Sequence, residues 1–268
     1  MSGDQPLIPP LGKSFKIKDY DPAETNGLKR EAGEAELEKL RVRLNELQDM
    51  MYADERYALL VVLQGIDASG KDGVSKSVFR EVSPLGCSVV GFGAPSDEEK
   101  HHDYLWRIHT ACPEKGKIVI FNRSHYESVL VERVRGFAPE ERWKGRYDEI
   151  NRFEELLTHE STVVMKFFLH ISEDEQRERL QARVNDPTKR WKFRMGDLED
   201  RKLWADYQSA FQDMIDECNT KHAPWHVVPA DKKWYRDVVI ARAIIERLEQ
   251  LDLRYPEPEK GVVGLTVV

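Results

Sequence analysis

Gly65-Ile-Asp-Ala-Ser-Gly70-Lys71 directly follows a continuous apolar run, Ala58-Leu-Leu-Val-Val-Leu63, and matches the pattern G-x-x-x-x-G-K. In such a turn the glycines let consecutive backbone N–H groups converge on an anion, the helix that follows adds positive potential, and the lysine reaches the terminal phosphates. We therefore predict a phosphate-binding loop between a buried strand and a helix. The alternative is a glycine-rich turn with a surface lysine.

The rest of the chain alternates apolar runs with stretches of helical character. Apolar runs without polar alternation suit strands that are buried on both faces, as in a parallel sheet covered by helices. The alternation predicts an α/β protein with three layers, a parallel sheet and helices on both of its faces. The other expected strands are 88–92, 117–121, 162–169 and 225–228, and the expected helices are 28–52, about 72–82, 97–112, 147–158, 173–184, 197–220 and 232–251.

Length and composition narrow the protein class. A chain of 268 residues can form one large domain, and no linker divides it, so we expect an irregular arm over 1–27, one domain over 28–254 and a loose tail over 255–268. No apolar run approaches the roughly 20 residues of a membrane span, and we see no secretory signal. Three cysteines without a CxxC spacing fit a reducing cytoplasm. The formal net charge of -7 disfavours a protein that coats nucleic acid.

The loop departs from the common motif at one position. Asp72 stands where Ser or Thr usually holds Mg²⁺, so another ligand must replace that hydroxyl. Asp67 lies inside the loop, where a carboxylate would repel phosphate unless a divalent cation sits between them. We therefore predict that Asp67 acts through Mg²⁺. A capping role for the following helix is the alternative, and it explains Asp72 better than Asp67.

A second polar stretch, 122–127, follows the strand expected over 117–121. In an open α/β sheet, ligands bind beyond the carboxyl ends of the strands. Arg123 can fork onto phosphate oxygens. Asn122 occupies a position that is often Asp in P-loop proteins, which leaves Glu127 as the nearest carboxylate and a second candidate metal ligand. The alternative for Arg123 and Glu127 is a surface ion pair, which contributes little.

A strongly basic segment follows the helix expected over 173–184. Seven basic residues stand against two acidic ones between Arg177 and Arg194, although the whole chain is acidic. Asp186-Pro187 ends the helix, because proline cannot continue it. We expect a basic lid over about 184–196 that covers a phosphate site and excludes water. A solvated helix face is the plainer alternative.

Several motifs together resemble the polyphosphate kinase 2 family, with similarity from about residue 15 to 251. They are Gly65–Gly73, Leu105–His109, Phe121–Glu127, Trp191–Phe193, Ala223–Ala230 and Lys233–Arg236. The resemblance implies a P-loop kinase-like fold with a basic lid, and phosphoryl transfer between inorganic polyphosphate and nucleotides with Mg²⁺ (or Mn²⁺). It most resembles the branch that acts on nucleoside mono- and diphosphates.

On that resemblance the catalytic residues are Asp67, Lys71, Arg123 and Arg183, with Asp67 and Glu127 as the metal ligands. We expect a homo-oligomer in the cytoplasm with no nucleic-acid or membrane partner. Two other functions fit the residues, an ATP-dependent nucleotide kinase and a non-catalytic polyphosphate-binding protein. The expected nucleotide- and polyphosphate-binding residues are Gly65, Ala68, Ser69, Gly70, Asp72, Gly73, Lys76, Arg107, Asn122, Glu127, Arg133, Lys189, Arg190 and Lys192.

Overall fold

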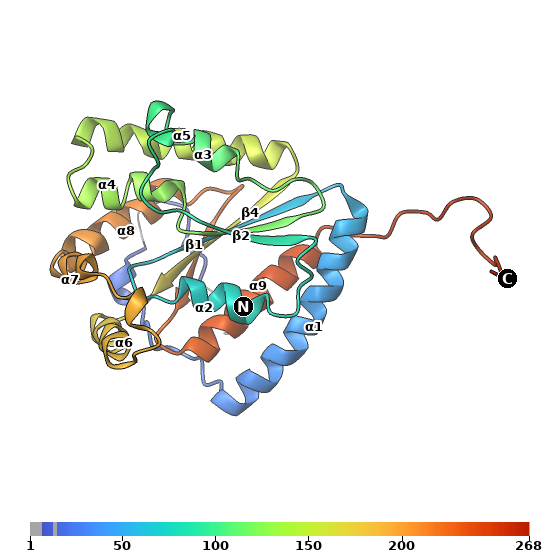
Figure 1. The fold of residues 1–268 in the computed structure, drawn as a ribbon, viewed down its shortest axis with the longest axis horizontal. Helices are drawn as coiled ribbons and strands as arrows, with labels where there is room; N and C mark the ends of the chain where they lie inside the picture. Colours follow the sequence, from blue (N-terminus) through green and yellow to red (C-terminus); the bar gives the residue numbers. More distant parts are fainter. Residues whose placement is uncertain (1–6, 13–14, 268) are drawn as a thin grey trace.

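The computed structural model describes residues 7–12 and 15–267, and its centre is a five-stranded parallel sheet (Figure 1). The predicted α/β class and the parallel sheet are confirmed, and each apolar run forms a strand within one or two residues of the expected range. The strands are β1 (Ala58–Gln64), β2 (Cys87–Gly91), β3 (Ile118–Asn122), β4 (Thr162–His170) and β5 (Trp225–Pro229), in the spatial order β2-β3-β1-β4-β5.

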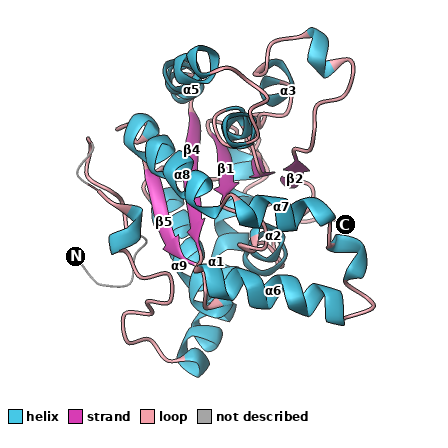
Figure 2. Ribbon diagram, turned by 90° about the vertical axis from the view of Figure 1, so that its left-hand side faces the viewer, coloured by secondary structure: helices cyan, strands magenta, loops and turns pink. Residues whose placement is uncertain are grey.

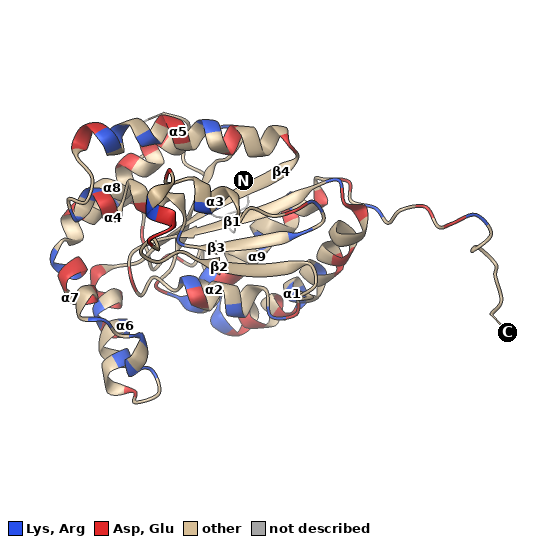
Figure 3. Cartoon of the chain, turned by 45° about the horizontal axis from the view of Figure 1, so that its top comes forward, with Lys and Arg blue, Asp and Glu red and all other residues tan. Residues whose placement is uncertain are grey.

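Helices cover both faces of the sheet, as predicted (Figure 2). α1, α2 and α9 lie on one face, and α5 and α8 lie on the other. Charged residues lie mainly on helices and loops and leave the sheet almost free of them (Figure 3). The helices are α1 (Arg30–Asp54), α2 (Lys71–Val78), α3 (Trp106–His109), α4 (Val131–Val134), α5 (Glu140–His159), α6 (Glu173–Asn185), α7 (Met195–Lys202), α8 (Trp204–Cys218) and α9 (Lys233–Glu249), with short 3-10 turns η1 (Ile17–Asp19), η2 (Glu99–His101), η3 (His125–Ser128) and η4 (Arg190–Lys192).

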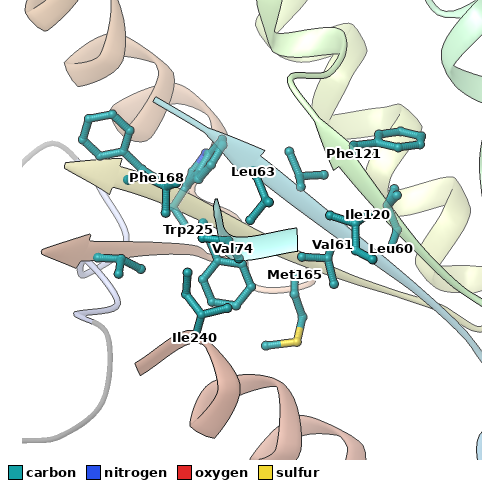
Figure 4. Close-up of a cluster of buried hydrophobic side chains, with 14 of the residues drawn as sticks. Leu60, Val61, Leu63, Val74, Ile120, Phe121, Met165, Phe168, Trp225 and Ile240 are labelled. Atoms are coloured by element: carbon teal, nitrogen blue, oxygen red, sulfur yellow. The ribbon is translucent and has the colours of Figure 1, made fainter. Parts of the chain in front are cut away.

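The core surrounds the central strands. Every residue of β1 and β4 is buried, and Val74 of α2 and Ile240 of α9 pack with side chains of the sheet (Figure 4). Full burial of one such side chain contributes about 1.5–3 kcal/mol. Because β1 is held on both faces and by β3 and β4 at its edges, the turn that follows Gln64 starts from a fixed point.

Three expectations about individual elements are wrong. β2 is an edge strand, and Val89 is 52% exposed, so its apolar run is not covered on both faces. The helix expected over 97–112 is interrupted, because the Asp103 carboxylate accepts a hydrogen bond from the Leu105 N–H (2.9 Å) and makes a local turn between η2 and α3. The helix expected over 197–220 divides at Leu203 into α7 and α8.

The two ends of the chain differ in how they meet the body. In the arm, Leu7 pairs with Val227 of β5 in one antiparallel bridge, and the Asn26 amide donates to the Tyr235 hydroxyl (2.8 Å). After α9 the chain first contacts α1, where the Tyr255 hydroxyl donates to Asp49 (2.8 Å), and then runs away from the body (Figure 1). Residues 1–6 and 13–14 of the predicted arm and Val268 of the tail lie outside the described residues, and the boundaries at 28 and 254 stay predictions. None of the described helices is long and apolar enough to cross a bilayer.

Candidate active site

A cleft of about 1070 Å³ lies at the carboxyl ends of β1 and β3. Its walls come from the loop after β1, the loop after β3, helix α6, the lid segment (residues 184–196) and the start of α9. The predicted residues that line it are Asp67, Ala68, Gly70, Lys71, Asp72, Gly73, Arg107, Asn122, Arg123, Glu127, Arg183, Lys189 and Lys192. The structure therefore brings together all four predicted catalytic residues.

The loop between β1 and α2 has the glycine-dependent geometry that the motif predicts. Gly70 is the N-cap of α2 and has φ of 107°, a left-handed conformation that favours glycine. A Cβ on Gly70 would also lie 1.9 Å from Arg236 Nη1. Both the backbone conformation and this close approach require glycine there, and the first turn of α2 lines the cleft with Lys71, Asp72 and Gly73.

Lys71 is buried at the base of the cleft, with 7% of its surface exposed. Its ammonium donates to the carbonyls of Gly65 (2.6 Å) and Ile66 (3.2 Å). Burial, together with the nearby charge of Arg123, lowers the pKa of Lys71 to about 8. The lysine is therefore fixed by the loop itself and sits among the groups that would surround a phosphate.

Arg123 connects the two loops at the cleft. It adopts φ of 65°, and its guanidinium pairs with Asp67 (2.5 Å) and with Glu127 (3.2 Å). Burial alone would lower the pKa of Arg123, but the charges of Glu127 and Asp67 raise it overall. The predicted ion pair between Arg123 and Glu127 exists, but it lies in the cleft wall instead of on the outer surface.

A buried network holds the loop after β3 from behind. Glu154 of α5 accepts hydrogen bonds from Lys166 Nζ (2.6 Å), the Tyr126 hydroxyl (2.8 Å) and His125 Nε2 (3.2 Å). Burial opposes ionisation of Glu154, yet Lys166 and His125 lower its pKa, so it stays a carboxylate. This network fixes the segment that presents Arg123 and Glu127.

Asp72, in the first turn of α2, and Asn122, the last residue of β3, are in contact. The Asn122 amide donates to Asp72 Oδ1 (2.6 Å), and Lys192 of the lid segment approaches Asp72 Oδ2 (3.4 Å). Partial burial opposes ionisation, but Asn122 and Lys192 lower the pKa of Asp72 overall. The lid therefore touches the phosphate-binding loop directly.

The lid segment presents several more cations to the cleft. Arg183, at the end of α6, lies 3.6 Å from Asp197 of α7. Lys189 and Arg194 line the cleft, as does Trp191, which is 76% exposed. The helix α6 ends before Pro187, as predicted, because Asp186 is extended. The observed positions agree with a basic cover over the loops below.

Three predicted binding residues do not reach the cleft. Lys76 is exposed on α2, about 140° around the helix from Lys71, so it faces away. Arg133 pairs with Asp213 (2.7 Å) and stacks on Trp143 (4.4 Å), and so joins α4 to α8 and α5. Arg190 donates to the Val184 carbonyl (2.8 Å) at the back of the lid segment.

Two other predicted positions lie beside the cleft. Gly65 lines a small neighbouring pocket next to α8, and Ser69 is buried beneath the loop. Ser69 Oγ lies 3.5 Å from Lys71 Nζ. Both positions shape the loop from behind.

Sequence reasoning missed two arginines that support the loop. Arg179 of α6 donates to the carbonyls of Ala68 (3.0 Å) and Ser69 (2.9 Å), and burial lowers its pKa. Arg236 of α9 is 2% exposed, pairs with Asp237 (2.6 Å) and lies against Gly70. The signal for Arg236 was present in the motif Lys233–Arg236, but nothing in the sequence placed that motif beside residue 70.

The side chains present fit a magnesium ion only if substrate supplies part of its shell. Asp67 and Glu127 offer carboxylate oxygens but share Arg123. No group of three or more His, Cys, Asp or Glu among residues 7–12 and 15–267 could hold a metal alone. Mg²⁺ is commonly bound through one or two carboxylates together with phosphate oxygens and water, so the cleft suits it.

Comparison with known proteins places this geometry in a family. Residues 27–256 match the model described as "Polyphosphate kinase 2 (PPK2)". The chain belongs to the polyphosphate kinase 2 family. The resemblance in the motifs is thereby confirmed, and with it the class of enzyme, a polyphosphate-dependent phosphotransferase with a P-loop kinase-like fold.

Two curated relatives and one solved structure match this polyphosphate kinase 2 chain over most of their length. It is 50% identical to "AMP/ADP-polyphosphate phosphotransferase" of Meiothermus ruber over 94% of this chain and 95% of that one. It is 41% identical to "ADP-polyphosphate phosphotransferase" of Rhodopseudomonas palustris over 80% and 78%. The crystal structure of polyphosphate kinase 2 from Arthrobacter aurescens TC1 has a TM-score of 0.91 at 40% identity, over 94% and 92%.

Proposed function

We propose that the enzyme transfers a terminal phosphoryl group directly between inorganic polyphosphate and both AMP and ADP. The observation that carries the proposal is the convergence of Lys71, Arg123 and Arg183 on one cleft at the N-terminus of α2. The Meiothermus ruber relative, named for both acceptors, supports the range of nucleotides.

The residues act by position and charge. Lys71 and the N–H groups at the start of α2 hold the phosphate that is transferred. Arg123, oriented by Asp67, and Arg183 at the end of α6 stabilise the charge on its equatorial oxygens. The attacking oxygen of an acceptor phosphate is already ionised at pH 7, so alignment replaces a general base.

Direct transfer agrees with the chemistry of the cleft wall. Among the described residues that line the cleft there is no histidine and no cysteine. His125, the histidine of the loop after β3, is buried behind the cleft wall, where it is hydrogen-bonded to Glu154. Histidine and cysteine are therefore absent as phospho-enzyme nucleophiles from the described cleft wall, and the carboxylates of Asp67 and Glu127 are paired with Arg123, which favours a single displacement.

Asp67 and Glu127 are the residues that would hold Mg²⁺ together with phosphate oxygens. When bound, the ion neutralises phosphate charge and draws the two anionic reactants together. Arg123 keeps both carboxylates oriented through its ion pairs.

The lining of the cleft suits two kinds of partner. Lys189 and Lys192 line it and suit a long polyanion. Phe92, Pro95 and Phe137 also line it and supply apolar surface that suits a nucleobase.

A donor assay tests the proposal. The enzyme is incubated with long-chain polyphosphate, Mg²⁺ and either AMP or ADP, without ATP. We expect ADP from AMP and ATP from ADP, with no product when polyphosphate is omitted. Turnover only with ATP as donor would identify an ATP-dependent nucleotide kinase, and tight polyphosphate binding without transfer would identify a binding protein.

The other expectations stay predictions. They are the cytoplasmic location, a homo-oligomeric state, the Mg²⁺ requirement and the absence of a nucleic-acid partner. The oligomeric state is accessible to light scattering, and the metal requirement to the donor assay with chelator.

A further inference from the structure

Two departures from the common P-loop pattern occur in this chain, and the structure places them in contact. In ordinary P-loop enzymes a Ser or Thr after the lysine and an Asp on a neighbouring strand together hold Mg²⁺. Here the first position is Asp72 and the second is Asn122, at the end of β3. The carboxylate is therefore present on the helix and absent from the strand.

The contact between them is a single well-formed hydrogen bond. The Asn122 amide lies 2.6 Å from Asp72 Oδ1. A carboxylate accepts only, so the amide must direct its N–H₂ group at Asp72. Asn122 is itself fixed by the sheet, because it pairs in register with Leu63 of β1. One oxygen of Asp72 is thus held in place from the strand side.

The other oxygen of Asp72 faces the cleft. The side chain is 61% exposed, and the contact between its Oδ2 and Lys192 is long (3.4 Å). Asp67 and Glu127 each have one oxygen engaged by the guanidinium of Arg123, at 2.5 and 3.2 Å. Asp72 Oδ2 is therefore held more loosely than the oxygens of Asp67 and Glu127 that Arg123 engages.

We propose that a metal-ligating carboxylate has exchanged positions in this chain, so that Asp72 on α2 binds the divalent ion together with Asp67 and Glu127, and Asn122 on β3 orients the Asp72 carboxylate. The inference rests on the proposed function for the presence of the ion. Lys192 contacts Asp72 Oδ2 in this structure, and this is the oxygen that the ion would use. The neutral amide at position 122 follows from the exchange, since two carboxylates at hydrogen-bond distance would repel.

A positional swap tests the exchange. Binding of Mn²⁺ is measured in the presence of ADP, from the electron paramagnetic resonance signal of the free ion. The Mn²⁺ that ADP binds without protein is measured separately and subtracted. We expect Asp72→Ser to weaken Mn²⁺ binding about tenfold or more. The double variant Asp72→Ser/Asn122→Asp, which restores the common pair, regains most of that loss. Asp97→Ser, on an exposed carboxylate outside the cleft, keeps wild-type binding.

The outcomes separate this inference from the proposed function. Wild-type Mn²⁺ affinity in Asp72→Ser overturns the exchange, as does a double variant that binds no better than the single one. A lower melting temperature in Asp72→Ser with unchanged Mn²⁺ binding would assign Asp72 to helix stability and also overturns it. Failure of wild-type enzyme to use polyphosphate, with Mn²⁺ still bound through Asp72, would contradict only the proposed function.

Discussion

The loops at the base of the cleft and the lid segment above them carry similar charges in different surroundings. Below, Lys71 is buried, and Arg123 is tied to Asp67 and Glu127. Above, Lys189 pairs with Asp186 of its own segment, and its side chain is 59% exposed. Charges that are shielded from water act strongly over short distances, whereas exposed charges are screened. The residues at the base of the cleft should therefore control the chemical step, and the lid segment should control binding of the polyanion.

Removal of the charge at the base should have the largest effect. Lys71→Ala deletes the ammonium beside the transferred phosphate, and we expect kcat to fall about 10³-fold, the order found for groups that stabilise a transition state. The fold should persist, because the Lys71 ammonium donates its hydrogen bonds to the carbonyls of its own loop. The matched control is Lys144→Ala on the exposed face of α5. A fall in kcat of less than tenfold in Lys71→Ala would show that the residues at the base of the cleft do not control the chemical step.

Two glycines test how rigidly each region is built. Gly70→Ala forces a side chain into φ of 107° and against Arg236, and we expect a loss of about 2–4 kcal/mol in the free energy of unfolding. Gly196→Ala, in α7 at the end of the lid segment, has its nearest contact at 3.9 Å and should be neutral or stabilising by up to about 1 kcal/mol. Denaturant melts measure both values. Equal effects at the two sites would contradict the difference in rigidity.

The pH dependence of kcat/KM should come from Lys71 at the base of the cleft. Lys71 has a pKa of about 8 instead of 10.5, so kcat/KM for polyphosphate should fall about tenfold per pH unit above pH 8. The unfolded chain binds this proton more tightly, so the contribution of Lys71 to stability rises between pH 8 and 10.5, and unfolding cannot explain the loss. A flat profile from pH 7 to 9.5 would contradict this assignment of the pKa.

The smallest effect is expected from the lid segment. Lys192→Ala removes one cation of the lid segment, whose side chain is 29% exposed, and KM for polyphosphate should rise a few-fold while kcat changes less than twofold. The dependence of KM on salt should also weaken, by analogy with counterion release from nucleic acids. Steady-state kinetics at several salt concentrations measure both. A loss in kcat as large as that of Lys71→Ala would make the lid segment part of the chemical step.

Local patterns in the sequence were enough to locate the main residues at the base of the cleft. The apolar run before Gly65 and the polar stretch after β3 placed Lys71 and Arg123 correctly, because carboxyl ends of parallel strands meet at one edge. Arg179 and Arg236 were missed as supports of the loop, because they reach residues 68–70 from more than 100 positions away. No local pattern encodes such a contact.

The sequence predicted the orientation of side chains on helices and turns less well. Lys76, Arg133 and Arg190 have the right charge and lie near the right segments, but helix phase and local partners turn them away from the cleft. The interruption at Asp103 depends on one side-chain hydrogen bond, which outweighs helical propensity over 97–112.

The account depends on transfer in one step between two anions held in the same cleft. Rapid-quench single turnover with ³²P-labelled polyphosphate and AMP follows the phosphoryl group itself. We expect the label to appear in the β-phosphate of ADP without prior labelling of the protein and without free orthophosphate ahead of it. Labelled protein that forms before ADP and decays as ADP appears would contradict direct transfer.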